Sequence, residues 1–253
     1  IKKAIWRARD EGVQILCLPE LCITAYGCED QFQSISTLEL AKDYLSKICP
    51  ETSGIAVTVG LPVLFGGAVY NTVAVAARGV LEGLVPKHHL ANDGVHYEHR
   101  WFKSWPKDKC FMHEGFEAEM GDIKFDIEGI RVGLEVCEDA WAANRSGVTF
   151  DSEDVDVVLN PSASHFAFGK FEKRVNIVKE GSRSLNVAYV YANLLGNESG
   201  RTIYDGDTII ANNGSLVACG DRFSYEDVVL TTAVVDLETN KINRLKSGSH
   251  TPS

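Results

Sequence analysis

The sequence predicts an α/β fold in which helices cover layered sheets of mixed strand direction. Apolar runs that suit strands alternate with helical patterns in the first and third quarters of the chain, and hairpin-like strands lie between and after them. The chain has 253 residues, of which 45% are hydrophobic, so a sizeable core can form. No repeat or linker divides the sequence, and we expect one domain over residues 1–253.

Three segments have the spacing of amphipathic helices. Residues 1–8 place apolar side chains at intervals of three and four, so the chain opens inside a helix that Gly12 ends. A second apolar stripe runs along residues 38–48. The segment 169–185 predicts a third helix, whose outer face carries basic and acidic side chains.

The predicted strands are short apolar runs bounded by glycine, proline or polar residues. In chain order they cover residues 13–18, 55–59, 72–77, 80–85, 123–127, 131–136, 155–159, 187–195, 208–210, 216–218 and 228–235. A loop rich in Trp and Lys, residues 100–109, separates the first four strands from the others.

The charge balance argues against nucleic acid as a partner. Lys and Arg number 25 against 35 Asp and Glu, a formal net charge of −10, whereas binding to a phosphate backbone needs clustered surplus cations. The uncharged, mostly apolar run of residues 55–70 is too short to span a bilayer and is broken by glycine and proline, so we expect no membrane partner. The first residues do not form an export signal, and seven cysteines then indicate reduced thiols in a cytoplasmic protein.

Three reactive side chains stand directly after strands. Glu20, Lys87 and Cys137 follow the first, fourth and sixth predicted strands, and strand ends are where open α/β sheets collect functional groups. Taken singly, each has an ordinary explanation: a lone Glu caps a helix, a lone Lys is a solvated charge, and a lone Cys is a small buried hydrophobe.

Together the three groups suit acyl transfer. A thiol attacks as thiolate, a form that nearby Lys87 favours. Apolar neighbours raise the pKa of Glu20, which can then take the thiol proton and give it to a leaving amine. The ammonium and a backbone N–H after Cys137 can hold the oxyanion. These residues therefore predict a hydrolase with a cysteine nucleophile.

Competing sites have weaker support. A loose group of possible metal ligands comprises His88, His89, His96, His99, Cys110 and His113. No His-Glu-x-x-His or Cys-x-x-Cys motif orders them, so we expect no metal site. The serine-hydrolase elbow and the phosphate loop are both absent from the sequence. A non-catalytic binding module remains as an alternative, but it leaves the three strand-end groups unexplained.

The order Glu, Lys, Cys, each at a strand end, resembles that of the nitrilase, or carbon–nitrogen hydrolase, superfamily. Residues 18–30 (LPELCITAYGCED), 94–102 (GVHYEHRWF) and 137–141 (CEDAW) resemble the glutaminase domain of glutamine-dependent NAD synthetases. The likeness covers nearly the whole chain and departs at Ala25, where that family commonly has glycine. It implies a nitrilase-type αββα sandwich with mixed sheets.

The resemblance also assigns roles, position by position. It implies that Cys137 is the nucleophile, Glu20 the general base and acid, and Lys87 the cation beside the oxyanion. Glu98 matches a second glutamate that orients the lysine and the substrate amide, and the backbone N–H of Glu138 would complete the oxyanion hole. The implied reaction needs no metal and no organic cofactor.

The implied substrate is glutamine, whose side-chain amide would be hydrolysed to glutamate and ammonia through a Cys thioester. The implied substrate-binding residues are Tyr26, Glu138, Trp141 and Ser164. A C-terminal synthetase domain, with ATP and Mg, would use the ammonia to make NAD from nicotinic acid adenine dinucleotide. A stand-alone ω-amidase of the same superfamily is the alternative.

The resemblance further implies that the chain is one piece of a homo-oligomeric enzyme. The chain opens in a helix, whereas the resembled fold begins with a central strand. Its end holds no Ser-Gly-Gly-x-Asp-Ser stretch of the kind that grips ATP phosphate. We therefore expect that it lacks the first strand and the synthetase domain, and that it makes no NAD alone.

Overall fold

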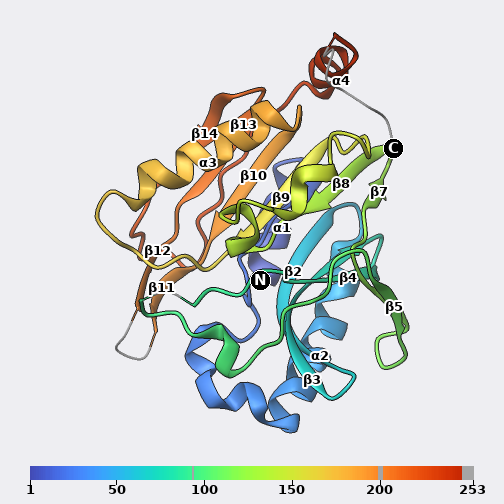
Figure 1. Ribbon diagram of the computed structural model, residues 1–253, viewed down its shortest axis with the longest axis vertical. Coiled ribbons are helices and arrows are strands. Elements are labelled where there is room, and N and C mark those ends of the chain that lie inside the picture. Colours follow the sequence, from blue (N-terminus) through green and yellow to red (C-terminus); the bar gives the residue numbers. More distant parts are fainter. Residues whose placement is uncertain (93, 199–201, 247–253) are drawn as a thin grey trace.

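Two six-stranded sheets pack face to face between layers of helices (Figure 1). The computed structural model describes residues 1–92, 94–198 and 202–246. The α-helices are α1 (Lys2–Asp10), α2 (Ile35–Ile48), α3 (Lys170–Ser184) and α4 (Leu237–Lys246). The 3-10 helices are η1 (Tyr26–Gln33), η2 (Cys49–Thr52), η3 (Glu98–Arg100), η4 (Cys137–Ala140) and η5 (Ser146–Thr149).

The first sheet contains β1 (Ile15–Leu16), β2 (Ala56–Phe65), β3 (Ala68–Ala77), β4 (Val80–Pro86), β5 (Cys110–His113) and β6 (Ala118–Gly121). Its order is β1-β2-β3-β4-β6-β5, with β1 parallel to β2 and antiparallel pairing from β2 through β4. Residues 15 and 16 of β1 lie opposite residues 56 and 57 of β2.

The second sheet contains β7 (Phe125–Ile127), β8 (Ile130–Leu134), β9 (Val157–Ser162), β10 (Ala188–Asn193), β13 (Thr208–Asn212) and β14 (Ser215–Cys219). Its order is β14-β13-β10-β9-β8-β7, and β8, β9 and β10 run parallel at its centre. A separate antiparallel pair joins β11 (Leu195–Glu198) to β12 (Thr202–Asp205).

Apolar layers hold these elements together. Between the sheets, Val75 and Val85 of the first sheet pack in one buried cluster with Val132 and Val157 of the second. α1 and α2 bury their apolar stripes on the outer face of the first sheet, and α3 buries Val178 on that of the second. The layers form an αββα sandwich with mixed sheets, which confirms the predicted fold class.

The three predicted helices are confirmed as α1, α2 and α3. The strand predicted over residues 228–235 is wrong, because within the described residues this segment belongs to no sheet. Some of its apolar side chains are partly buried: Val228 and Val235 pack against the two clusters that flank the first sheet. A cavity of about 700 Å³ lies beside it, lined by residues of this segment, α1, β1, β10 and β13. The segment thus buries only part of its apolar surface, since Val234 is 98% exposed, and among the described residues its backbone has no neighbouring strand.

Some elements escaped the sequence analysis. The short strands β5, β6, β11 and β12 and the helix α4 follow no clear apolar period. In the described ranges, no helix has both the length and the apolar character that crossing a bilayer requires.

Candidate active site

The predicted strand-end groups meet at the seam between the two sheets. Glu20 follows β1 and Lys87 follows β4 in the first sheet, while Cys137 follows β8 in the second and begins η4. Glu98, the first residue of η3, joins them. Glu20 and Glu98 are 0% exposed, Lys87 is 1% exposed and Cys137 is 7% exposed. Side chains distant in sequence are therefore gathered in one buried centre.

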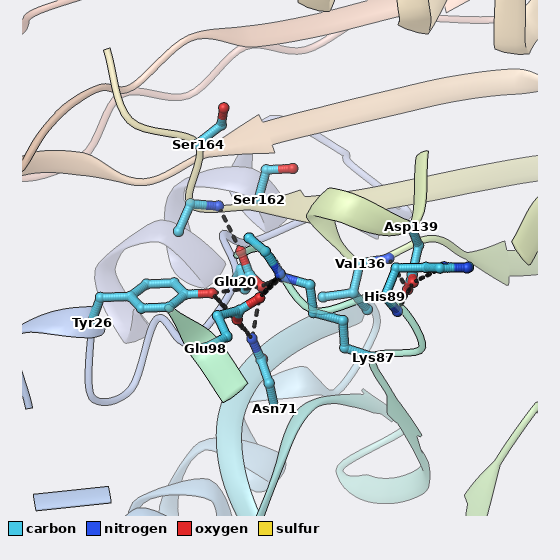
Figure 2. A network of polar contacts seen from close by, with 12 residues as sticks. Glu20, Tyr26, Asn71, Lys87, His89, Glu98, Val136, Asp139, Ser162 and Ser164 are labelled. Carbon is cyan, nitrogen blue, oxygen red and sulfur yellow. Dashed lines mark hydrogen bonds and ion pairs between the residues drawn. The ribbon is translucent and has the colours of Figure 1, made fainter. Parts of the chain in front are cut away.

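Lys87 is the hub of this centre. Its Nζ donates to Glu20 Oε1 at 2.7 Å and to Glu98 Oε2 at 2.8 Å, and Figure 2 shows the three side chains converging. An ammonium has three N–H donors. Two therefore serve the carboxylates, and among the described residues the third is left for another acceptor.

Asn71 and Tyr26 bridge the two carboxylates (Figure 2). The Asn71 side-chain amide donates to Glu20 Oε1 at 2.7 Å and to Glu98 Oε1 at 2.9 Å. The Tyr26 hydroxyl lies 2.9 Å from Glu20 Oε1 and 2.5 Å from Glu98 Oε1. The hydroxyl has one proton, so it can donate to only one carboxylate at a time. Tyr26 thus contacts the charged groups, and its expected contact with substrate stays a prediction.

The two oxygens of Glu20 differ in their surroundings. Oε1 faces the ammonium of Lys87, the amide of Asn71 and the hydroxyl of Tyr26. Oε2 accepts from the backbone N–H of Ala163, directly after β9, at 2.9 Å. The same N–H also interacts with the Cys137 sulfur. Glu20 Oε2 is therefore the oxygen on the side of the thiol.

The charges in the centre make Glu20 the group that is ready to hold a proton. Burial raises the pKa of Glu20, as the sequence predicts, although Lys87 opposes the rise. Burial acts likewise on Glu98, but Lys87, the Tyr26 hydroxyl and the Ala91 N–H together outweigh it, and the pKa of Glu98 is lowered. Burial alone would lower the pKa of Lys87, yet the two carboxylates raise it well above its ordinary value. Glu98 and Lys87 thus stay charged while Glu20 can exchange a proton.

Cys137 rests as a thiol. Burial raises the pKa of the thiol, Glu20 adds to the rise, and Lys87 lowers it by less. The effect expected of Lys87 is therefore present, but burial outweighs it, because a thiolate loses its hydration in this interior. The proton has to leave during the attack, and the carboxylate of Glu20 is the base beside it.

The backbone is tightly constrained at Cys137 and at the loop that carries Glu20. Cys137 has φ of +48°, a left-handed conformation that non-glycine residues seldom adopt and that marks strain at a functional turn. A Cβ at Gly60 would lie 2.2 Å from the backbone N of Leu21, so only glycine lets β2 pass the loop that carries Glu20. Ala25, where the resembled family commonly has glycine, also has a positive φ of +56°.

The other residues expected to bind substrate surround the centre. Glu138 follows the nucleophile in η4, and Trp141 ends that turn, with its ring 5.9 Å from Lys170 Nζ. Ser164 is 4% exposed, and its hydroxyl points away from Glu20 in Figure 2. Its carbonyl accepts from Arg174 at 2.7 Å. The substrate roles of these residues stay predictions.

Three contributors were missed from the sequence. Asn71 is a buried amide within β3, which only the polar break in an apolar run could have indicated. Asp139 belongs to the CEDAW string, but its partners come from another sheet. Ala163 acts through its backbone N–H, which leaves no signal in a side-chain pattern.

A small cavity of about 40 Å³ borders this centre and is lined by Tyr26, His96, Glu98 and Tyr204 among others. It is large enough for water but not for an amino acid. Within the described residues, no group of three or more His, Cys, Asp or Glu side chains is placed to hold a metal ion.

The chain matches known proteins over almost its whole length. The family model described as carbon-nitrogen hydrolase matches residues 1–244. This chain belongs to the carbon-nitrogen hydrolase family. The hydrolase is 32% identical over 251 residues to a glutamine-dependent NAD(+) synthetase of Oryza sativa subsp. indica, which covers 94% of this chain and 34% of the rice protein. It is 31% identical to a glutamine-dependent NAD(+) synthetase of Homo sapiens, which covers 98% of this chain and 37% of the human protein.

Solved structures give the same picture. A glutamine-dependent NAD(+) synthetase from Cytophaga hutchinsonii is 42% identical, with a TM-score of 0.84 over 91% of this hydrolase and 39% of that chain. A nitrilase-superfamily amidase from Nesterenkonia is 18% identical, with a TM-score of 0.74 over 97% of this chain and 86% of that chain. The second likeness shows the fold alone. The hydrolase spans only 34% to 37% of the length of the rice and human relatives.

Proposed function

We propose that this carbon-nitrogen hydrolase cleaves the side-chain amide of glutamine to glutamate and ammonia through a thioester on Cys137. The observation that carries the proposal is the buried centre, in which a thiol, an ammonium and a carboxyl group of raised pKa lie together. The glutamine-dependent synthetases to which the chain is 31% to 42% identical support glutamine as the substrate.

In the first half-reaction the sulfur of Cys137 attacks the amide carbon. Its proton passes to Glu20 Oε2, the oxygen on the side of the thiol. The carbonyl oxygen gains the negative charge, and the remaining N–H of Lys87 Nζ and the backbone N–H of Glu138 donate to it. Glu20 then gives the proton to the amide nitrogen, the C–N bond breaks, and ammonia leaves.

In the second half-reaction Glu20 takes a proton from water, which attacks the thioester carbon. The C–S bond breaks, glutamate leaves, and the sulfur recovers its proton from Glu20. Glu98 keeps its charge throughout because Lys87 holds the pKa of that carboxyl low. Glu98 therefore orients Lys87 rather than exchanging protons. No metal or organic cofactor enters either half-reaction.

We also propose a setting for the reaction. The relatives are about three times as long as this chain, and a C-terminal synthetase domain, with ATP and Mg, would use the ammonia for NAD synthesis. The enzyme would be cytoplasmic, because the reduced thiol that the reaction needs is kept there, and, as the resemblance implies, a homo-oligomer.

The test is ammonia release from glutamine compared with release from a panel of ω-amides and nitriles. We expect glutamine to be hydrolysed with the highest kcat/KM, and the Cys137→Ala protein to release none. A clear preference for another ω-amide would favour a stand-alone ω-amidase. No turnover of any amide would favour a non-catalytic binding module and contradict the proposal.

A second assay concerns the synthetase. We expect no NAD from nicotinic acid adenine dinucleotide, ATP and glutamine with the 253-residue chain alone. Robust NAD synthesis by this chain would contradict the proposal that a separate synthetase domain makes NAD.

A further inference from the structure

Asp139 is a buried carboxylate in the loop of the nucleophile, yet it plays no part in the reaction proposed above. It is 1% exposed. Its Oδ1 accepts from the backbone N–H of His89 at 2.7 Å and from the His89 ring Nδ1 at 3.0 Å, while its Oδ2 accepts from the Val136 N–H at 3.1 Å. The His88 N–H points at the same carboxylate at 3.2 Å. Each oxygen of Asp139 is thus bonded, which fits a group that holds structure rather than one that transfers protons.

These donors come from two different sheets. His88 and His89 directly follow Lys87, at the end of β4 in the first sheet, and Val136 directly precedes Cys137, after β8 in the second. Figure 2 shows the carboxylate of Asp139 between these two loops. Asp139 therefore ties the loop of the ammonium to the loop of the thiol.

These hydrogen bonds between the two loops matter because the two sheets pack together through apolar side chains. Val75 and Val85 pack against Val132 and Val157, and such contacts resist separation more than sliding. Lys87 and Cys137 have to stay aligned to a fraction of an ångström for the oxyanion to form between them. The apolar layer does not supply that precision, whereas directional hydrogen bonds to a buried carboxylate do.

We propose that Asp139 is a positioning residue that sets the alignment of Lys87 with Cys137 across the seam between the sheets. The proposal rests on the proposed cysteine chemistry, but its test does not depend on glutamine as the substrate. The simpler alternative is that Asp139 only caps the turn η4 through Val136, which would affect stability and leave the reactivity of the thiol unchanged.

The chain offers a matched control at the other end of β8. Asp156 is 3% exposed and accepts from the backbone N–H of Arg131 at 3.0 Å. It joins β8 to the start of β9 within one sheet, at the end of β8 that is opposite to Cys137, and its Oδ1 lies 3.6 Å from Lys241 Nζ. Asp156→Asn thus removes a buried carboxylate of the same kind without touching the tie between the sheets.

The experiment measures how fast iodoacetamide alkylates Cys137 in the purified wild-type, Asp139→Asn and Asp156→Asn proteins across a range of pH. All seven cysteines are free in the structure, so peptide mass spectrometry follows Cys137 alone. Thermal unfolding is measured in parallel, together with kcat and KM for glutamine.

We expect Asp139→Asn to slow alkylation of Cys137 about tenfold and to lower kcat by about as much, with KM nearly unchanged, since a misplacement of about 1 Å can cost up to about a hundredfold. Asp156→Asn should lose comparable thermal stability and alkylate at the wild-type rate. Equal alkylation rates in the two variants would overturn the proposal. Failure of the wild type to hydrolyse glutamine would overturn the proposed substrate, and alkylation would still decide the role of Asp139.

A second variant covers the case in which Asp139→Asn does not fold. His89→Ala removes one donor to Asp139 from a side chain that is 23% exposed. We expect it to slow alkylation about threefold, because the backbone donors to Asp139 remain and Asp139 loses only one of its hydrogen bonds; the ring also loses its contact with Asn144 at 3.1 Å. An unchanged rate in a folded His89→Ala protein would contradict the proposal.

Discussion

Two buried clusters in this molecule have almost the same composition. In one, Lys87 pairs with Glu20 and Glu98, and an asparagine amide donates to both carboxylates. In the other, Arg174 pairs with Asp205 at 2.8 Å and Asp207 at 2.9 Å. Asn193 donates to both of these carboxylates as well, at 3.1 and 2.8 Å.

The difference lies in what else the cation touches. Arg174 also donates to the carbonyls of Ser164 at 2.7 Å and His165 at 2.8 Å, so its guanidinium fastens α3 to the chain that leaves β9. Lys87 has the Cys137 thiol beside it and, among the described residues, one N–H donor left for another acceptor. The comparison teaches that a buried ion cluster becomes a reaction centre through its neighbours. One cluster holds the fold together, and the other holds the thiol that we propose as the nucleophile.

The largest expected effect comes from removing the thiol that distinguishes the two clusters. Cys137→Ala should lower ammonia release from glutamine by about 10⁴-fold or more, because the covalent route is lost. The cavity left by one sulfur should cost only about 1 kcal/mol of unfolding free energy. Ammonia assays and thermal unfolding check both parts. A near wild-type rate in the purified variant would show that Cys137 is not the nucleophile.

The next comparison removes each cation in turn. Lys87→Met and Arg174→Met should each cost about 3–5 kcal/mol of unfolding free energy, since either change leaves two buried carboxylates without their cation. Urea unfolding measures that loss. Only Lys87→Met should also lower the rate at which Cys137 is alkylated, because only Lys87 favours the thiolate. An equal fall in reactivity in both variants would break the distinction drawn between the clusters.

The smallest effect is a pH dependence at the Arg174 cluster. Burial raises the pKa of Asp207, although Arg174 opposes the rise. A raised pKa in the folded state means that the stabilising contribution is complete below the unfolded pKa of about 3.9 and is lost as pH rises through the folded value. Asp207→Asn removes this loss, so the stability of this variant relative to the wild type should increase as pH rises through the folded pKa of Asp207.

Thermal unfolding of the wild type and Asp207→Asn over a pH series measures this difference. Asp205→Asn is the matched control, because both Asp205 oxygens accept from Arg174, at 2.8 and 3.0 Å. That variant should be less stable than the wild type at neutral pH. If the stability of Asp207→Asn relative to the wild type instead fell as pH rose, the raised pKa of Asp207 would be contradicted.

The sequence predicted the reacting groups better than their supports. Glu20, Lys87 and Cys137 each stand after an apolar run, so their position at strand ends could be inferred locally. Glu98 follows no strand and came from resemblance alone. Asn71 and Asp139 were missed because a supporting group is defined by its partners, and Glu98 lies 27 residues from Asn71 while His89 lies 50 residues from Asp139 along the chain.

In the fold as well, features set by neighbouring residues in the sequence were predicted, and a feature that depends on distant residues was not. The periods that predict α1, α2 and α3 are local, and the structure confirms them. Residues 228–235 also have an apolar pattern typical of a strand, but a strand needs a hydrogen-bonding neighbour, and a cavity of about 700 Å³ adjoins this segment. The apolar pattern there predicted a buried strand, whereas the segment is only partly buried and pairs with no strand among the described residues.

The most direct test of the central claim is to trap the covalent intermediate. Wild-type protein is mixed with excess glutamine, quenched in acid within the first turnover, digested, and studied by mass spectrometry. The account predicts a γ-glutamyl group on the peptide that contains Cys137, formed together with ammonia in equal amount and absent from Cys137→Ala. Release of ammonia at the wild-type rate with no adduct on Cys137, or with the adduct on another residue, would contradict it.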